Sequence, residues 1–383
     1  MSSTNPIELS LVIPCLNEED TLENCLVKAN ESLQKSLLTT EIIVADNGST
    51  DRSREIALRN GARVVTIEEA GYGNALMGGI SASGAKWVII GDADENHDFA
   101  ELPKFIAKLE EGYDLVQGCR FPSGGGNIKQ GSMSFLHRRF GNPFFSLLVR
   151  NWFDMDIHDV YCGFRGFTSE LYEKLDQRCT GMEFAPEMII KAGLLNANIA
   201  EVPITHHPDG RKTHASHMHT FRDGWRTMRF FLMYSPRWLF LFPGFILFTL
   251  GLVFFGLGFT LFSGYDQSFL VQNFIIATLF IMCGYQSILF AVFTKVFAIN
   301  ENLFPKDERL DRFFEVVNLE RGLIVSFISL LTGLILLGFG VFSFDVLELT
   351  RTHFLFSGAA LIALGFQTIL FGFFVSILGL KRK

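Results

Sequence analysis

The chain has 383 residues, enough for more than one domain, and 49% of them are hydrophobic. Its formal net charge of −7 argues against a general nucleic-acid-binding protein. The sequence is mixed and charged up to about Ser235 and is dominated by Phe, Leu, Ile and Gly after Trp238. The N-terminus has no basic segment followed by an apolar one, so we expect no cleaved signal and a front half that starts in the cytoplasm.

Alternating strands and helices are predicted in the first part of the chain. We expect strands at residues 8–14, 41–45, 63–67, 88–90, 114–118, 159–167 and 199–204. We expect helices at residues 17–35, 51–60, 74–83, 132–151 and 183–195, with Asn17 as the N-cap of the first. Short links between alternating elements indicate a parallel sheet with right-handed crossovers, and therefore an α/β nucleotide-binding domain.

Two carboxylates follow the strand at residues 88–90. The apolar run before them is typical of a strand buried on both faces, and it leads into Asp92-Ala93-Asp94. Open α/β sheets bind ligands at the carboxyl ends of their strands. Two carboxylates in this position can share Mg²⁺ or Mn²⁺, which would then bind a diphosphate. A solvated acidic turn is the alternative, and for an isolated motif it is the commoner one.

Gly71 and Gly73 form a G-x-G that does not match the dinucleotide-binding fingerprint. That fingerprint follows the first strand of the fold, whereas the first strand here ends in the glycine-free run PCLNE. We expect the two glycines to permit close approach of the backbone to a ligand or to a neighbouring element.

A basic amphipathic helix is predicted at residues 219–237. Arg222, Arg226 and Arg229 share its polar face, and apolar residues that can face lipid lie opposite: Phe221, Trp225, Met228, Phe231 and Leu232. Basic residues opposite aromatic ones suit a helix lying in the bilayer interface. A helix of a soluble bundle is the alternative.

Four apolar segments follow, at about 238–263, 269–294, 323–344 and 354–380. Each supplies about 20 or more largely apolar residues, enough to cross roughly 30 Å of hydrocarbon. The connections at 264–268 and 345–353 carry only Arg351 as a certain cation, whereas the other side is basic at Lys295, Lys306, Arg309, Arg312, Arg321, Lys381, Arg382 and Lys383. This asymmetry predicts a cytoplasmic front domain and a cytoplasmic C-terminus. The expected division is 1–210 for the α/β domain, 211–237 for the juxtamembrane region and 238–383 for the transmembrane domain.

Five motifs occur in a fixed order: LVIPCLNE at 11–18, DNGSTD at 46–51, G-x-G-x-A at 71–75, D-x-D at 92–94 and CGFR at 162–165. In this order they resemble the family-2 glycosyltransferases, especially dolichol-phosphate mannosyltransferase and bacterial polyprenyl-phosphate glycosyltransferases. The resemblance covers about residues 8–210, and RDGWR at 222–226 fits bacterial members. It implies a GT-A (Rossmann-like) α/β nucleotide-sugar-binding domain, followed here by the interfacial helix and four transmembrane helices.

The resemblance also implies a donor site. Its nucleotide-sugar-binding residues would be Pro14, Leu16, Asn17, Glu18, Asp46, Gly71, Gly73 and Asp92. Asp46 would accept a base N–H, with an N-cap for the following helix as the alternative. Mg²⁺ or Mn²⁺ would be held by Asp92, Asp94 and Asn96, where Asn96 replaces the Gln of the family's D-x-D-x-Q pattern.

Catalytic roles are expected for Asp94, Arg120, Asp159 and Arg165. Asp159 is the candidate base should the acceptor be a hydroxyl, and its pairing with Arg165 or Arg120 is the alternative. Arginine binds phosphate bidentately, so Arg120 and Arg165 are candidate phosphate ligands. The candidate ligands of an acceptor phosphate are Arg138, Arg139, Arg211 and Lys212. A solvated helix face remains the alternative for the first two.

The function implied is that of an inverting membrane glycosyltransferase. It would move a sugar from a UDP- or GDP-linked donor to polyprenyl phosphate on the cytoplasmic leaflet. Because a phosphate oxygen is already ionised near neutral pH, no strong general base is required. Two alternatives stay open: a lipid hydroxyl such as diacylglycerol as acceptor, and a transport protein with a regulatory nucleotide-sugar-binding domain. The spans carry no mid-span charges, which argues against transport.

The expected partners are the nucleotide-sugar donor, the lipid acceptor and the membrane, without nucleic acid, and a homo-oligomer is left open. We expect a multi-pass protein of the cell membrane, specifically the bacterial inner membrane.

Overall fold

The structure is a computed structural model that describes residues 6–211, 220–260, 266–301, 303–342 and 347–379. The chain divides into two compact units, Met1–Phe231 and Leu232–Lys383. The first is an α/β unit and the second is a helical unit.

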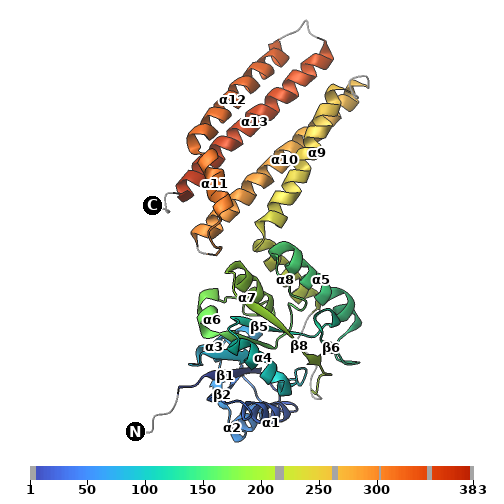
Figure 1. Ribbon diagram of the computed structural model, residues 1–383. Helices are drawn as coiled ribbons and strands as arrows, with labels where there is room; N and C mark the ends of the chain where they lie inside the picture. Colours follow the sequence, from blue (N-terminus) through green and yellow to red (C-terminus); the bar gives the residue numbers. More distant parts are fainter. Residues whose placement is uncertain (1–5, 212–219, 261–265, 302, 343–346, 380–383) are drawn as a thin grey trace. The chain divides into compact units, whose positions relative to one another are not determined.

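The α/β unit alternates strands with helices (Figure 1). Its strands are β1 (Leu9–Cys15), β2 (Thr40–Asp46), β3 (Arg63–Thr66), β4 (Trp87–Ile90), β5 (Leu115–Cys119), β6 (Asn127–Ile128), β7 (Arg165–Thr168), β8 (Ile199–Pro203) and β9 (Thr205–His206). Its helices are α1 (Leu22–Leu33), α2 (Ser53–Arg59), α3 (Tyr72–Ser81), α4 (Leu102–Glu110), α5 (Asn142–Phe153), α6 (Ser169–Leu175), α7 (Phe184–Leu194) and α8 (Thr220–Met233). The short helical turns are η1 (Phe99–Glu101), η2 (Pro122–Gly124) and η3 (His137–Gly141).

Seven strands form one sheet in the order β3-β2-β1-β4-β7-β5-β8. β1 is parallel to β2 and β4, and β5 is parallel to β8, as predicted. β7 is antiparallel to both of its neighbours, β4 and β5, so the prediction of a purely parallel sheet is wrong there.

The predicted strand at 159–167 is also too long, because β7 begins only at Arg165. The residues before it form a turn, and two of its carbonyl groups bind a side chain instead of a neighbouring strand. Gln117 Nε2 donates to the carbonyls of Asp159 and Cys162, at 2.9 and 3.1 Å.

Both faces of the sheet are buried. Leu11 and Ile13 of β1 pack in one cluster with Leu26 of α1 and Phe105 of α4, and α1 and α2 cover this face of β1 and β2 (Figure 1). On the other face, α3 lies so close that a Cβ built on Gly79 would be 2.6 Å from Val12. Burial on both faces explains why these strands read as continuous apolar runs.

The start of α1 differs from the prediction. The helix begins at Leu22 with Thr21 at the N-cap position, so the expectation that Asn17 caps it is wrong. Asn17 instead has a φ of +59°, and its Oδ1 accepts a hydrogen bond of 2.8 Å from the Thr50 amide. It therefore joins the loop after β1 to the loop after β2.

α8 is amphipathic, but its apolar residues are arranged differently from the prediction. Phe221 and Trp225 are 87% and 64% exposed and lie on the same exposed side as the arginines. Phe231, expected to face lipid, is fully buried, with its ring centroid 5.7 Å from that of Phe145 and 5.9 Å from that of Phe153. The helix thus packs on the α/β unit along one side.

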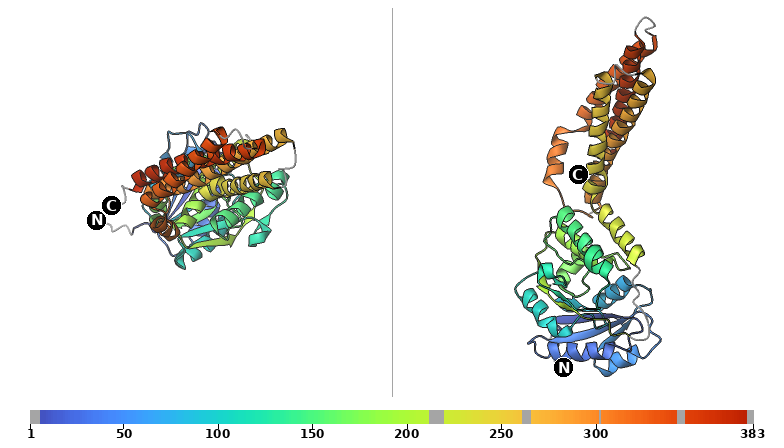
Figure 2. Two further views of the ribbon diagram at one scale, coloured as in Figure 1. Left: turned by 90° about the horizontal axis from the view of Figure 1, so that it is seen from above. Right: turned by 90° about the vertical axis from the view of Figure 1, so that its right-hand side faces the viewer.

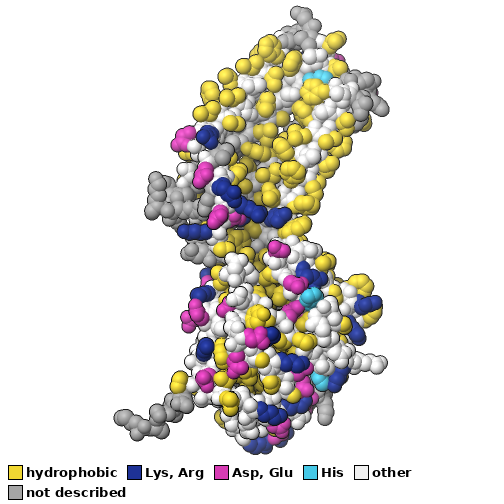
Figure 3. All heavy atoms as spheres, in the orientation of Figure 1, with side chains coloured by type: hydrophobic (Ala, Val, Ile, Leu, Met, Phe, Trp, Pro, Cys, Tyr) yellow, Lys and Arg dark blue, Asp and Glu magenta, His cyan; other side chains and the backbone are white. Residues whose placement is uncertain are grey.

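The helical unit contains η4 (Arg237–Leu241), α9 (Phe242–Phe259), α10 (Gln267–Asn300), α11 (Glu308–Val316), α12 (Leu319–Phe342) and α13 (Glu348–Gly379). Within the described residues, four helical segments are long and apolar enough to cross a membrane: Arg237–Phe259, Gln267–Asn300, Leu319–Phe342 and Glu348–Leu378. These confirm the four predicted spans, and hydrophobic side chains dominate their visible surface in Figure 3.

The four long helices form two hairpins, α9 with α10 and α12 with α13 (Figures 1 and 2). Small residues bring the backbones together, since a Cβ on Gly251 would lie 2.6 Å from the Ile281 amide and one on Gly358 would lie 2.7 Å from the Gly333 carbonyl. Close approach through small residues is typical of helices packed within a membrane.

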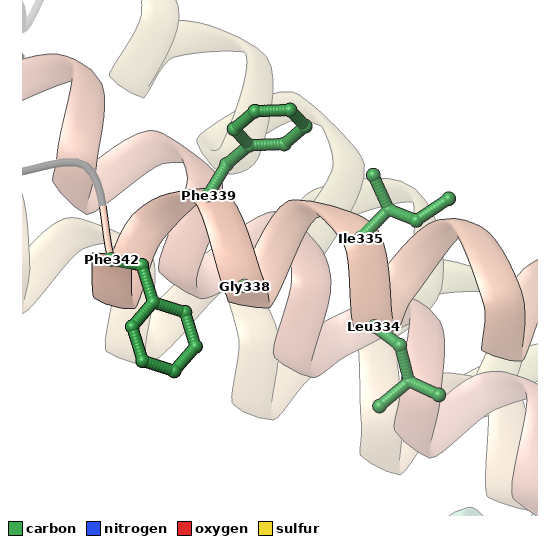
Figure 4. A pocket seen from close by; sticks show the side chains of 5 residues that line it. All are labelled: Leu334, Ile335, Gly338, Phe339 and Phe342. Atoms are coloured by element: carbon green, nitrogen blue, oxygen red, sulfur yellow. The ribbon is translucent and has the colours of Figure 1, made fainter.

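A shallow groove lies on α12 and is lined by Leu334, Ile335, Gly338, Phe339 and Phe342 (Figure 4). Its lining is apolar, and the two phenylalanines are more than half exposed, as expected of a surface that faces lipid. No lining side chain can bind a phosphate or a metal ion. The polar clusters that can do so lie in the α/β unit.

Candidate active site

Three segments meet at the end of the sheet where β1 and β4 terminate. Val12 of β1 lies opposite Ile90 of β4, and Arg165 of β7 lies opposite Ile90 on the other side. Because β7 runs in reverse, the residues that precede it reach the same edge as the residues that follow β1 and β4. The reversed strand thus brings the CGFR motif to the Asp-x-Asp.

Asp92 is held by residues from two other elements. The Tyr72 hydroxyl donates a hydrogen bond of 2.9 Å to its Oδ1. Gly163 leaves room for the other oxygen, because a Cβ built there would lie 2.5 Å from Asp92 Oδ2. Burial raises the pKa of Asp92, and the hydrogen bond from Tyr72 opposes that rise.

His97 lies beside the same carboxylate without pairing to it. Its Nδ1 is 3.6 Å from Asp92 Oδ2, and the side chain is almost fully buried. Burial lowers the pKa of His97 to about 3, with the Arg120 charge acting in the same direction. His97 is therefore neutral at physiological pH, and the contact is not an ion pair.

Asp94 is the second carboxylate of the motif. Burial raises its pKa to about 7, the Asp92 charge adds to the rise, and Arg211 opposes it. The Asn96 amide donates to Asp94 Oδ1 at 3.1 Å, and Asn96 Nδ2 donates to Oδ2. Asn96 Oδ1 is buried and has no hydrogen-bond partner among the described residues.

These residues fit a divalent cation. No group of three Asp, Glu, His or Cys side chains that could hold a metal occurs among the described residues, so Asp92 and Asp94 need another ligand. Asn96 Oδ1 supplies an oxygen, and Mg²⁺ and Mn²⁺ prefer oxygen ligands, completing their coordination with water or phosphate. Burial raises the pKa of both carboxyls, and a bound cation would favour their ionised forms.

The segment that leaves β9 crosses this edge. The His207 amide donates to the Asn96 carbonyl at 3.0 Å, and the Gly210 amide donates to the Asp94 carbonyl at 3.1 Å. Arg211 then lies between Glu18 and Asp94, rather than in an open position where it could meet an acceptor phosphate. Lys212, the other predicted phosphate ligand of this segment, lies outside the described residues.

Arg120 and Asp159 form a buried pair. Arg120 Nε and Nη2 donate to the two carboxylate oxygens at 2.7 and 2.9 Å, and the Arg120 amide donates at 3.0 Å. Burial alone would raise the pKa of Asp159, but the charge and hydrogen bonds of Arg120 outweigh it and lower that pKa. Asp159 is fully buried with both oxygens engaged, so the pairing alternative is the arrangement found, and a role of Asp159 as a base stays a prediction.

The Arg165 guanidinium donates hydrogen bonds to backbone carbonyl groups and is not exposed. It is fully buried, and its Nη1 donates to the Ala185 carbonyl at 2.6 Å while Nη2 donates to the Cys162 carbonyl at 2.7 Å. These bonds tie the turn before β7 to the start of α7. These contacts leave the guanidinium turned to the backbone, and the expected role of Arg165 as a phosphate ligand or catalytic group stays a prediction.

The predicted nucleotide-binding residues lie along the ends of β1 and β2. Pro14 and Leu16 are partly exposed there, next to the buried Glu18. Asp46 is fully buried, and Arg54 Nε donates to its Oδ2 at 2.6 Å. Its alternative role as an N-cap is wrong, because Arg52 holds the cap position of α2.

Gly71 and Gly73 permit close packing between elements. The Gly71 amide donates to Asn47 Oδ1 at 2.8 Å, and the Gly73 amide donates to the Thr180 carbonyl at 2.9 Å. A Cβ on Gly71 would lie 2.6 Å from the Thr180 oxygen, and Gly71 has a φ of +143°. Both amides are thus engaged next to Tyr72, which contacts Asp92, and the expected role of the two glycines in nucleotide-sugar binding stays a prediction.

Tyr72, His97 and Gly163 were not predicted as site residues. Tyr72 and Gly163 lie inside motifs that the sequence does display, the G-x-G and CGFR runs, but neither motif reveals that its neighbour is Asp92. Arg138 and Arg139 are exposed on η3, which agrees with the solvated-face alternative and leaves their phosphate role untested.

Comparison with known proteins assigns the chain to a family. Residues 10–176 match the model for glycosyl transferase family 2, and residues 292–379 match the glycosyltransferase family 2 C-terminal transmembrane region. The low-salt glycan biosynthesis hexosyltransferase Agl6 of Haloferax volcanii is 35% identical over 327 residues, 85% of this chain and 77% of that protein. Fold, site and matches define a membrane glycosyltransferase with a GT-A-like domain. The chain belongs to glycosyltransferase family 2.

Other matches are more partial. A dolichyl-phosphate hexose transferase of Haloferax volcanii is 31% identical over 198 residues, 51% of this chain and 82% of that protein. A glucosyl-3-phosphoglycerate synthase from Mycobacterium tuberculosis, solved with Mn²⁺, UDP and glucosyl-3-phosphoglycerate, is 23% identical with a TM-score of 0.44, covering 60% of this chain and 78% of that chain.

Proposed function

We propose that this protein transfers a sugar, with inversion, from a UDP- or GDP-linked donor to polyprenyl phosphate at the cytoplasmic surface of the cell membrane. The observation that carries the proposal is the pairing of Asp92 and Asp94 at the carboxyl end of β4 with the unpartnered Asn96 Oδ1 beside them. The four apolar helices and the dolichyl-phosphate hexose transferase relative support a lipid acceptor.

Asp92, Asp94 and Asn96 would hold the Mg²⁺ or Mn²⁺ ion. When bound, the ion would offset the negative charge of the departing nucleoside diphosphate. Tyr72 fixes the orientation of Asp92, and the Asn96 amide fixes that of Asp94. These contacts prepare the carboxylates before the donor arrives, so little reorganisation accompanies the reaction.

The state of Asp159 favours a phosphate acceptor over a hydroxyl acceptor. A lipid hydroxyl needs a group that removes its proton, whereas a phosphate oxygen is already ionised near neutral pH. The candidate base Asp159 is fully buried and bound by Arg120 through both oxygens. Transfer to a phosphate would therefore depend on positioning and charge, without general-base catalysis.

The test is transfer by the purified full-length protein in detergent or nanodiscs. Radiolabelled UDP- and GDP-sugars are offered with polyprenyl phosphate or with diacylglycerol, with and without Mn²⁺. We expect a lipid-linked product that is labile in mild acid, as a sugar phosphodiester is. Asp94→Asn should lower the rate by at least about a hundredfold, since removal of a metal ligand eliminates charge stabilisation worth several kcal/mol.

Asp156→Asn is the matched control, because the Asp156 side chain is 90% exposed and the variant should keep the full rate. An acid-stable product formed from diacylglycerol would refute the phosphate acceptor. Full activity of Asp94→Asn, or equal activity without any divalent cation, would refute the metal site. Sugar-lipid flipping without donor turnover would point instead to transport.

A further inference from the structure

Arg211 is enclosed by carboxylates at the candidate metal site. Its Nη1 is 3.1 Å from Glu18 Oε1, and its Nη2 is 3.2 Å from Asp94 Oδ2 and 2.5 Å from Asp209 Oδ2. Its side chain is only 8% exposed. The guanidinium group thus contacts a carboxylate oxygen of Asp94, which is one of the proposed metal ligands.

The backbone fixes Arg211 in this place. Residues 207–211, here called the exit segment, are bound to the Asp-x-Asp loop by the two amide hydrogen bonds to Asn96 and Asp94. Gly210 has no room for a side chain, because a Cβ there would overlap Glu95 and lie 2.9 Å from Thr21 Cγ2. The contacts of Arg211 therefore belong to a packed segment and are not those of a surface side chain that folds back by chance.

A guanidinium group and a divalent cation cannot share this oxygen without repulsion. Two like charges a few ångströms apart repel more strongly in a partly buried site than in water, because the effective dielectric is lower. Arginine cannot relieve the repulsion by losing its proton, because its pKa is far above physiological pH. A divalent ion bound to Asp94 would therefore weaken the contact between Arg211 and this carboxylate.

We propose that Arg211 is a built-in counter-cation, which occupies Asp94 while the metal is absent and is exchanged for the divalent ion when the donor binds. The inference rests on the proposed function, because it takes Asp92 and Asp94 as the metal ligands. After the exchange, the guanidinium group of Arg211 can bind an anionic ligand such as a phosphate. It stays near the site because the backbone of the exit segment is bound to the Asp-x-Asp loop. Metal binding and the later capture of a phosphate are thereby coupled through one side chain.

The test measures Mn²⁺ binding to the full-length protein in detergent, without nucleotide, by the loss of the free Mn²⁺ signal in electron paramagnetic resonance. Arg211→Gln should bind Mn²⁺ at least about tenfold more tightly than the unmodified protein, since charged hydrogen bonds to Glu18 and Asp94 no longer have to be broken. Arg211→Lys should lie between the two, because a lysine keeps the charge but cannot bridge both carboxylates.

Two further variants make the outcome decisive. Arg59→Gln removes one positive charge from an exposed pair with Glu23, and Mn²⁺ affinity should not change. Asp94→Asn should abolish the binding. If Asp94→Asn abolishes binding and neither Arg211 variant tightens it, the exchange is refuted while the metal site stands. If Asp94→Asn binds Mn²⁺ as well as the unmodified protein, the proposed metal site fails and the exchange with it.

Discussion

Asp92 shows how one residue depends on its neighbours for a defined geometry. Tyr72 comes from the start of α3 and Gly163 from the turn before β7, and neither is adjacent to Asp92 in sequence. One holds an oxygen by a hydrogen bond, and the other leaves space for the second oxygen. In the metal site proposed above, loss of groups that orient a ligand in this way is expected to change metal affinity about 10–100-fold.

Gly163→Ala should therefore weaken Mn²⁺ binding and sugar transfer by about 10–100-fold, because the new methyl group displaces the Asp92 carboxylate. The measurement is a Mn²⁺ titration alongside the transfer assay. Gly84→Ala is the control, since a Cβ at Gly84 meets nothing within 4 Å. Unchanged Mn²⁺ affinity of Gly163→Ala would show that Asp92 is not held at a fixed position.

His97 and His206 make stability depend on pH. Burial lowers the pKa of each to about 3, from an ordinary value of 6.5. Between these values the unfolded chain binds more protons than the folded one, so stability is full above pH 6.5 and falls as the pH drops toward 3. Each histidine contributes up to about 1.4 kcal/mol per pH unit in that window.

The two histidines should thus lower the apparent unfolding temperature between pH 7 and pH 5, whereas Asp94, whose pKa is raised to about 7, acts in the opposite direction. The double variant His97→Gln/His206→Asn should lose the destabilisation that the histidines cause on acidification, although its stability at pH 7.5 is lower because packing is lost. The measurement is thermal unfolding of the detergent-solubilised protein across pH. Parallel pH profiles of the two proteins would contradict the prediction.

At the residue scale, the sequence located the carboxylates but not their partners. Asp92 and Asp94 could be predicted because a buried strand leads directly into them. Asp159 pairs with Arg120, which is 39 residues away in sequence. Glu18 pairs with Arg211, which is 193 residues away. Pattern and spacing along one chain carry little information about such pairs.

At the scale of elements, β7 has the largest effect on the site. It separates β4 from β5 and brings the turn at 160–164 beside the Asp-x-Asp loop. Arg165 holds that turn through the carbonyls of Cys162 and Ala185. A buried charge serves here to satisfy backbone groups that no neighbouring strand can reach.

Arg165→Met should consequently destabilise the α/β unit by about 3 kcal/mol or more, since several buried carbonyl groups lose their donors. We expect a clear fall in the apparent unfolding temperature. Arg63→Met is the control, because Arg63 is 47% exposed in its pair with Glu41 and should cost far less. Full stability of Arg165→Met with lost activity would restore a direct catalytic role for Arg165.

Most strands were predictable because their apolar runs are buried on both faces. The reversed strand was not, since DVYCGFRGF has the composition of a strand throughout, while the first six residues turn. α4 and α6 were missed, although Leu102, Phe105, Ile106 and Leu109 of α4 have helical spacing and are all buried. The position of Asn17 after a strand suggested an N-cap for α1, but Asn17 has a left-handed backbone conformation and the helix begins five residues later, at Leu22.

On the scale of the whole molecule, the four spans were predictable from length and hydropathy alone. The sequence did not predict which of these helices pack against each other. Glycines at seven-residue intervals on α9, at 244, 251 and 258, are buried and mark the side that packs on α10. The orientation of the spans in the membrane remains a prediction from the distribution of lysine and arginine.

That orientation predicts which connections face outward. In a Cys283→Ser background, Asp266→Cys at the start of α10 should react in intact cells with a membrane-impermeant maleimide. Lys306→Cys, between α10 and α11, should react only after permeabilisation. The reverse pattern would place the α/β unit on the outer side and exclude a cytoplasmic donor.

The place of β7 in the sheet also sets an order of events during synthesis. β4 and β5 cannot be joined until residues 165–168 have left the ribosome, and β8 adds the edge strand by residue 203, before the first span begins at Arg237. The catalytic unit can thus fold while the membrane anchor is still being translated. Ribosome-bound chains should become protease-resistant only once Pro203 has emerged, so the enzyme would reach the membrane with its site already assembled.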